Sequence, residues 1–334
     1  MNKFPQLGQL FMVGFPGNQL DDSTLRLIRE LGVNNFILFR RNVKSPEQVR
    51  VLCRELRDAC RGAGLPGPLI SIDQEGGTVA RLPLPFTQFD DARTLAESQD
   101  PERALGHYIA ACVKELSEAG INMNLAPVLD VCPAGEGYFM EKRVFGGDPA
   151  HVGRLGAYVV KGFQQGGIAA CGKHFPGLGA AKLDPHLQLP VVSRPLEQIK
   201  EIDLVPFLQA VAAGIAAIMT SHTIYTDLDP QTPATLSRRV LKGLLRDELG
   251  FHGLIITDDL EMGAIENERS VAGAAVQAFR AGADLLLICH DHEKIRQAYN
   301  ALQEAVAKKE VTQQDCDDAL QRVSFVRRQF AGKP

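Results

Sequence analysis

The stretch of residues 172–190 combines an acid, a base and a cation in a short span. It reads GKHFPGLGAAKLDPHLQLP and places Asp184 and His186 on either side of Pro185. Proline fixes its own φ and biases the preceding residue toward extended backbone, so these two side chains point the same way. A carboxylate beside an imidazole stabilises the imidazolium, which makes the pair a candidate general acid/base. A tight turn on a solvated loop is the alternative, because Asp-Pro is also a turn signal.

Two adjacent carboxylates, Asp258 and Asp259, follow an apolar run in IITDDLEMGAI. Neighbours in extended chain face opposite sides. We therefore expect only one of them to point into a site and the other to cap the helix that follows. A carboxylate opposite a proton donor suits displacement at an acetal carbon, where one group attacks and the other protonates the leaving oxygen. This combination predicts glycoside hydrolysis.

Eight short apolar runs supply the strands that would position these groups. They alternate with helical patterns at 21–32, 45–64, 100–120 and 148–167, each of which opens on Ser or Asp and ends on Gly. Continuous apolarity indicates strands covered on both faces, in βα units around a parallel sheet. The sequence predicts an α/β fold, a (β/α)8 TIM barrel formed as a single domain over residues 1–334, with a doubly wound sheet as the alternative. The predicted strands are 10–15, 34–39, 68–73, 121–131, 168–175, 215–222, 253–259 and 283–290.

Reactive groups of such a barrel collect at the carboxyl ends of its strands. Five predicted strands end in polar residues, at 73–77, Asp130, 173–177, 221–222 and 257–259. Each could be a turn or helix cap alone, but together they predict one site at one rim. Glu75 is expected in the turn formed by Gly76 and Gly77.

Composition limits the classes of function. The net charge is −4 with scattered basic residues, which argues against nucleic acid as a partner, and no apolar run is long enough to span a membrane. Seven cysteines without a Cys-x-x-Cys pair, and no recognisable leader, predict a cytoplasmic protein with reduced thiols. We expect no cofactor, because GAGLPG lies in the wrong context for a dinucleotide, and no metal, because His290 and His292 lack a third ligand. The oligomeric state stays open.

Several longer motifs together resemble glycoside hydrolase family 3, in particular the bacterial β-N-acetylglucosaminidases of the NagZ type. They are IDQEGGTVARL, NLAPVLDV with KRVFGGDP, KHFPGLG with DPH, MTSHTIY with PATLS, and IITDDLEM. The resemblance implies a TIM barrel that removes terminal β-linked N-acetylglucosamine with retention, through a covalent glycosyl-enzyme. It also implies a carbohydrate substrate such as the muropeptides of peptidoglycan recycling.

The same resemblance assigns roles by position. Asp258 matches the nucleophile, His186 the acid/base and Asp184 its carboxylate partner. The matches to sugar-binding residues are Asp73, Arg81, Arg143, Lys173 and His174. The chain departs from the usual family motifs at Thr78, Leu178 and Pro185. Two alternatives therefore stay open, a β-glycoside phosphorylase that uses the same dyad and a sugar-binding barrel with little turnover.

Overall fold

Eight parallel strands form the centre of the molecule, in a computed structural model that describes residues 6–185 and 187–332. They run β11-β9-β7-β6-β3-β2-β1-β12 around the sheet. A parallel bridge between Ile256 and Leu285 joins the two end strands, so the sheet closes into a barrel. The TIM-barrel prediction is thereby confirmed over the doubly wound alternative. The strands are β1 (Phe11–Val13), β2 (Asn35–Leu38), β3 (Leu69–Ile72), β6 (Met123–Asn124), β7 (Ala169–Phe175), β9 (Ala217–Thr220), β11 (Leu254–Ile256) and β12 (Leu286–Ile288), each within a predicted run.

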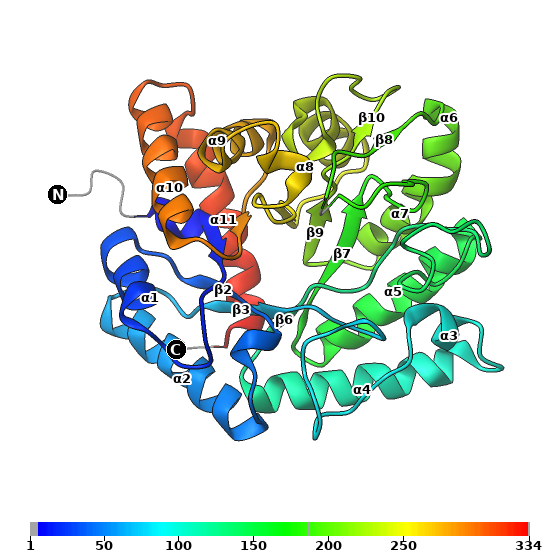
Figure 1. Cartoon of the computed structure of the whole chain (residues 1–334), viewed down its shortest axis with the longest axis horizontal. Helices are drawn as coiled ribbons and strands as arrows, with labels where there is room; N and C mark the ends of the chain where they lie inside the picture. The colour runs from blue at the N-terminus through cyan, green and yellow to red at the C-terminus, as the bar shows by residue number, and fades with distance from the viewer. Residues whose placement is uncertain (1–5, 186, 333–334) are drawn as a thin grey trace.

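The helices surround the barrel (Figure 1). Asp21, Ser45, Asp100 and Asp148 each accept a backbone N–H at a helix start, as their side chains predicted. The α-helices are α1 (Asp22–Arg26), α2 (Pro46–Gly62), α3 (Ala92–Ala96), α4 (Pro101–Ala119), α5 (Pro149–Gln165), α6 (Leu196–Gln198), α7 (Leu204–Ala212), α8 (Gly263–Glu266), α9 (Val271–Ala281), α10 (His292–Ala307) and α11 (Gln313–Phe330). Tighter or wider helical turns are η1 (Leu7–Leu10), η2 (Leu27–Leu31), η3 (Arg40–Asn42), η4 (Ile199–Asp203), η5 (Ala234–Leu236) and η6 (Arg239–Glu248).

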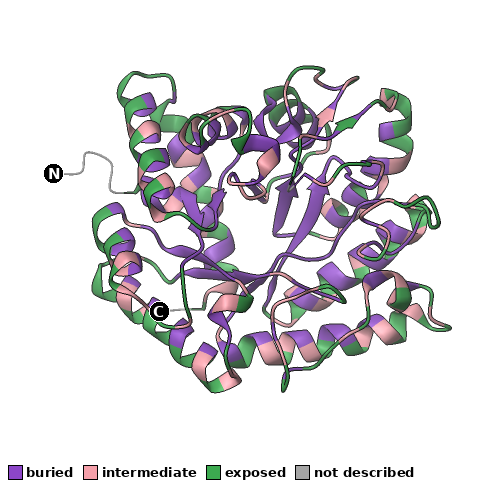
Figure 2. Cartoon of the chain, viewed as in Figure 1, coloured by how far each residue is buried: buried purple, intermediate pink, exposed green. Residues whose placement is uncertain are grey.

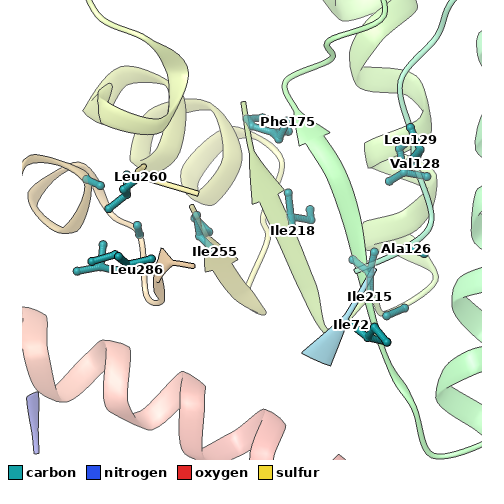
Figure 3. Packing of buried hydrophobic residues seen from close by; sticks show 14 of the residues in the cluster. Ile72, Ala126, Val128, Leu129, Phe175, Ile215, Ile218, Ile255, Leu260 and Leu286 are labelled. Atoms are coloured by element: carbon teal, nitrogen blue, oxygen red, sulfur yellow. The ribbon is translucent and has the colours of Figure 1, made fainter. Parts of the chain in front are cut away.

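The strand side chains divide into two apolar layers, because successive residues of a strand face opposite sides. In β9, Ile218 belongs to the large cluster between strands and helices, whereas Met219 belongs to the smaller cluster inside the barrel. The strands are buried on both faces (Figure 2), and Figure 3 shows part of the outer layer. Val323 and Val326 of α11 join the inner cluster. This helix packs against the end of the barrel where the strands begin, which leaves the carboxyl end for a site.

Two small two-stranded sheets lie at that carboxyl end. An antiparallel pair, β4 (Gln74–Gly76) and β5 (Val79–Ala80), follows β3. A parallel pair, β8 (Val191–Val192) and β10 (Ile224–Tyr225), follows β7 and β9. The second pair anchors the far end of the 172–190 stretch to the barrel.

All seven cysteines lie buried and unpaired within the described residues. Burial raises the pKa of Cys53, Cys60, Cys132 and Cys171 to about 12, which keeps these thiols protonated. Among residues 6–185 and 187–332, no helix has both the length and the apolar character needed to cross a bilayer.

Candidate active site

A cavity of about 230 Å³ lies at the carboxyl end of the barrel strands. Its apolar floor comes from the inner layer, with Ile37, Leu125 and Met219 among its residues. Its polar wall contains most of the residues singled out in the sequence, namely Asp73, Arg81, Arg143, Lys173, His174 and Asp258. The fold thus brings together groups that lie up to 185 positions apart in the chain.

A row of alternating charges runs along one wall of this cavity and continues behind it. The Lys173 Nζ atom lies 2.7 Å from Asp73 Oδ1 and 2.6 Å from Glu75 Oε1. At one end of the row, Arg81 Nη2 lies 3.5 Å from Asp73 Oδ2. At the other end, Arg143 Nη2 lies 2.8 Å from Glu75 Oε1. The Lys173 side chain is only 2% exposed. A buried ammonium is stable there because it has two carboxylates as partners, and they hold its pKa above the usual value against the opposing effect of burial.

Glu75 does not act as a mere turn residue, which corrects the sequence-based expectation. It lies in β4 just before the Gly76-Gly77 turn, and its side chain is 4% exposed. Burial would raise the pKa of Glu75, but Lys173 and Arg143 outweigh burial and hold the pKa well below its usual range. The carboxylate is therefore charged at any physiological pH. Nothing in the local sequence reveals this, because both cations come from distant segments.

His174 is fixed by a carboxylate on the neighbouring strand end. Its Nδ1 atom lies 2.8 Å from Asp130 Oδ2, and Asp130 Oδ1 accepts the backbone N–H groups of His174 and Leu178. Asp130 is fully buried. The carboxylate thus fixes the orientation of the ring and favours a proton on Nδ1. The sequence predicted that Asp130 lies at a strand end but indicated no role for it.

Asp258 and Asp259 are both among the residues that line the cavity. The Asp259 N–H donates to Asp258 Oδ1 at 2.9 Å, and both residues lie beyond the end of β11, where the strict alternation of a strand no longer applies. Asp259 Oδ1 caps the Glu261 N–H at 3.1 Å, in a turn before α8. Burial, with the nearby Glu261 and Asp258 carboxylates, raises the pKa of Asp259 to about 7. Asp258 thus has a neighbour that is largely neutral below pH 7.

The polar residues at the sixth strand end support the site from behind. His222 is buried, with its Nε2 atom 2.9 Å from the Asp259 carbonyl oxygen and its Nδ1 atom 2.8 Å from Thr235 Oγ1. It therefore holds the backbone that carries the two aspartates.

The loop predicted to carry the acid/base dyad reaches the cavity through Pro185. This proline is buried and lines the cavity, and its carbonyl oxygen accepts the Ala264 N–H at 3.1 Å. Asp184 is half-buried and its carbonyl accepts the N–H groups of Leu187 and Gln188. His186 lies outside the described residues.

The three departures from the family motifs differ in position. Leu178 and Pro185 line the cavity, and Leu178 is 2% exposed. Thr78 is exposed in the turn between β4 and β5 and is not among the cavity-lining residues. Two of the three departures therefore change the wall of the cavity itself.

The cavity has an aromatic edge, formed by Phe39 and His290, that the sequence did not predict. The Phe39 ring, at the end of β2, lies 5.5 Å from the His290 ring and 4.3 Å from the Arg41 guanidinium carbon. His290 Nε2 lies 3.6 Å from Asp259 Oδ2. Its position at a strand end was the only feature of the sequence that could have identified Phe39 as a site residue. Apolar periodicity alone does not distinguish such a residue from a core residue.

His292 serves packing between distant segments. Its Nδ1 atom lies 2.9 Å from Ser23 Oγ and its Nε2 atom 3.3 Å from the Gly14 carbonyl oxygen. Within the part of the chain that the structure describes, no three His, Cys, Asp or Glu side chains are grouped to hold a metal ion.

Comparisons with known proteins agree with this geometry. The sequence model of the glycosyl hydrolase family 3 N-terminal domain matches residues 5–326. The chain is 37% identical to the beta-hexosaminidase of Pseudomonas aeruginosa PAO1 over 292 residues, which covers 87% of this chain and 86% of that protein. It is 38% identical to the beta-hexosaminidase of Thiobacillus denitrificans, with 86% and 79% covered.

Solved structures give the same result. The family 3 β-N-acetylglucosaminidase from Paenibacillus sp. FPU-7 superposes with a TM-score of 0.93 at 38% identity, over 100% of this chain and 64% of that chain. NagZ from Neisseria gonorrhoeae in complex with N-trifluoroacetyl-D-glucosamine superposes with a TM-score of 0.78 at 28% identity, over 95% and 98%. The chain thus spans about two thirds of the first of these structures and nearly all of the second.

Proposed function

Because the chain belongs to glycosyl hydrolase family 3, we propose that it is a retaining β-N-acetylhexosaminidase that releases terminal β-linked N-acetylglucosamine. The single observation that carries this proposal is the placement of Asp258 at the end of β11, on the wall of a cavity rich in hydrogen-bonding charged groups. Carboxylate, guanidinium, ammonium and imidazole groups give the directional hydrogen bonds that a polyhydroxy ligand needs.

The proposed reaction has two displacements. Asp258 attacks the anomeric carbon and forms a covalent glycosyl-enzyme, while His186 gives a proton to the departing glycosidic oxygen. His186, oriented by Asp184, then takes a proton from water, and the water oxygen replaces Asp258 at the same carbon. Two inversions leave the configuration retained.

The shape of the cavity supports release of a terminal sugar. Its volume of about 230 Å³ is small beside the roughly 300–1,000 Å³ of pockets that hold drug-sized ligands. Among the described residues, the inner apolar layer fills the barrel below the cavity and includes Val323 and Val326 of α11. One sugar ring can enter from the carboxyl end, and the rest of the substrate stays outside.

The natural substrates we propose are muropeptide fragments of peptidoglycan, cleaved in the cytoplasm. This step rests on the likeness to NagZ-type proteins and on seven buried cysteines without a disulfide in the described residues, which suit a reducing compartment.

Hydrolysis of p-nitrophenyl β-N-acetylglucosaminide and of the β-glucoside, with and without phosphate, tests the function. We expect preference for the N-acetyl sugar and N-acetylglucosamine as product in both buffers. A glycosyl phosphate would establish the phosphorylase instead. Binding of N-acetylglucosamine without turnover of either glycoside would establish a sugar-binding barrel.

Replacement of His186 by alanine is expected to reduce kcat/KM by roughly 10²–10⁴-fold for an N-acetylglucosaminyl disaccharide, in the range of general acid catalysis. The loss should be much smaller for the p-nitrophenyl glycoside, because p-nitrophenolate leaves without a proton. Rates on the two substrates measure the difference. His252→Ala, at an exposed position, is the matched control. Equal losses on both substrates would contradict the role of His186 as proton donor.

A further inference from the structure

We propose that Glu75 is a positioning residue, a shared counter-ion that holds Lys173 and Arg143 in the orientation in which they meet the sugar. This role rests on the proposed function and extends it. Glu75 would set the positions of two sugar-binding residues although the substrate does not touch it.

Glu75 stands behind the sugar cavity. It is absent from the residues that line that cavity, and it lies instead against a small void formed with Tyr108, Ala126 and Val128. Both of its oxygens are engaged, Oε1 with Lys173 and with Arg143 Nη2, and Oε2 with Arg143 Nε at 2.9 Å. A 4% exposed side chain with these partners has no free face to offer a ligand.

The contact with Glu75 determines which N–H donors of Lys173 and Arg143 remain available to a sugar. An ammonium has three N–H donors, and Lys173 spends two of them on Asp73 and Glu75. One donor is left for a sugar hydroxyl. Arg143 commits Nε and Nη2 to Glu75 and donates one Nη1 hydrogen to Met140 Sδ at 3.5 Å, so the second Nη1 hydrogen remains for the cavity.

Arg143 needs such a partner because of where it lies in the chain. It belongs to the long segment between β6 and α5, outside any helix or strand, and such segments are held less rigidly than the elements they connect. A bidentate carboxylate fixes both the plane and the position of a guanidinium. Glu75 thus ties this connection to β4.

The charge balance of the wall also depends on Glu75. The charged groups around Lys173 are Asp73, Glu75 and Arg143, with Cys171 on the same strand protonated. Without Glu75, Lys173 would keep one carboxylate partner, Asp73, which also faces Arg81, and Arg143 would keep only the electrostatic attraction of Asp73 and Asp130. Burial would then favour loss of the Lys173 proton at a lower pH.

The test is Glu75→Gln, which keeps the size of the side chain and removes its charge. We expect kcat/KM for p-nitrophenyl β-N-acetylglucosaminide to fall by about 10²-fold, the effect of a displacement near 1 Å. Titration calorimetry with N-acetylglucosamine across alkaline pH should show affinity that falls at a lower pH in this variant than in wild type, because the Lys173 pKa is held above its usual value when both carboxylates are present. Glu75→Asp keeps the charge, and we expect it to retain the wild-type pH dependence with a reduced kcat/KM.

Asp284→Asn is the matched control. Asp284 is also a fully buried carboxylate between two cations, Arg246 and Arg322, but it lies at the start of β12, at the other end of the barrel. It should lower the melting temperature without changing the pH dependence of binding. The inference is overturned if Glu75→Gln resembles Asp284→Asn, or if it keeps kcat/KM within threefold of wild type. Wild-type protein that neither binds nor cleaves the N-acetyl sugar would overturn the proposed function itself.

Discussion

Asp258→Asn is expected to lower kcat for N-acetylglucosaminide hydrolysis by roughly four orders of magnitude or more, because an amide cannot form the glycosyl-enzyme. The side chain stays nearly the same size, and the Asp259 N–H that bonds Oδ1 can still find an oxygen. Folding should therefore be preserved, and steady-state kinetics with a melting curve separate loss of chemistry from loss of structure.

Asp259→Asn provides the matched control at the adjacent position. The pKa of Asp259 is raised to about 7, so at pH 6 asparagine replaces a carboxyl group that is mainly protonated, and we expect a loss of less than about tenfold. Azide should restore turnover of Asp258→Ala and yield an α-glycosyl azide, since azide would occupy the position of the missing carboxylate. Equal losses at 258 and 259, or a β-glycosyl azide, would exclude Asp258 as the nucleophile.

Lys173→Met is expected to have the largest effect on stability and a large one on activity. Removal of the ammonium leaves Asp73 and Glu75 facing each other with their shared partner gone. Breaking a buried ion pair from one side costs about 3–5 kcal/mol of the free energy of unfolding. Loss of a charged donor, with the disturbance of the wall, should reduce kcat/KM by about a thousandfold. Denaturant unfolding and steady-state kinetics measure the two effects.

Two variants make this result interpretable. Lys200→Met breaks an exposed pair with Glu248, whose side chain is 53% exposed, and should change the free energy of unfolding by no more than about 1 kcal/mol. Lys173→Met combined with Asp73→Asn removes the carboxylate that is left with only Arg81, at 3.5 Å, and should regain part of the stability but not the activity. A double variant less stable than Lys173→Met would contradict the view that unpaired charge causes the loss.

Local sequence was sufficient to predict the positions of the strands and of most helices. A parallel strand covered on both faces must be apolar without interruption, so runs such as 215–222 and 253–259 identify β9 and β11. Helix starts were recognisable because their first N–H groups need an acceptor, which Ser45 and Asp100 supply. The runs overestimated strand length, since apolar residues continue into buried loops where the backbone pairing has ended.

The residues of the candidate site were predictable for a related reason. Parallel strands in a barrel all end at one rim, so polar residues after separate strands must gather there. Asp73, Lys173 and Asp258 could therefore be grouped before any distance was known, and all three line the cavity.

Only the tertiary structure decided which of these groups face the cavity and which support it. The partners of Glu75, Lys173 and Arg143, come from segments 98 and 68 positions away, and Asp130 is 44 positions from His174. Asp258 and Asp259 both line the cavity, in a segment beyond β11 where the alternation of a strand has ended. Sequence periodicity reports which face of its own element a residue occupies. Burial, ion pairing and charge state depend on what the closed barrel brings against that face, and this is set by contacts between distant segments.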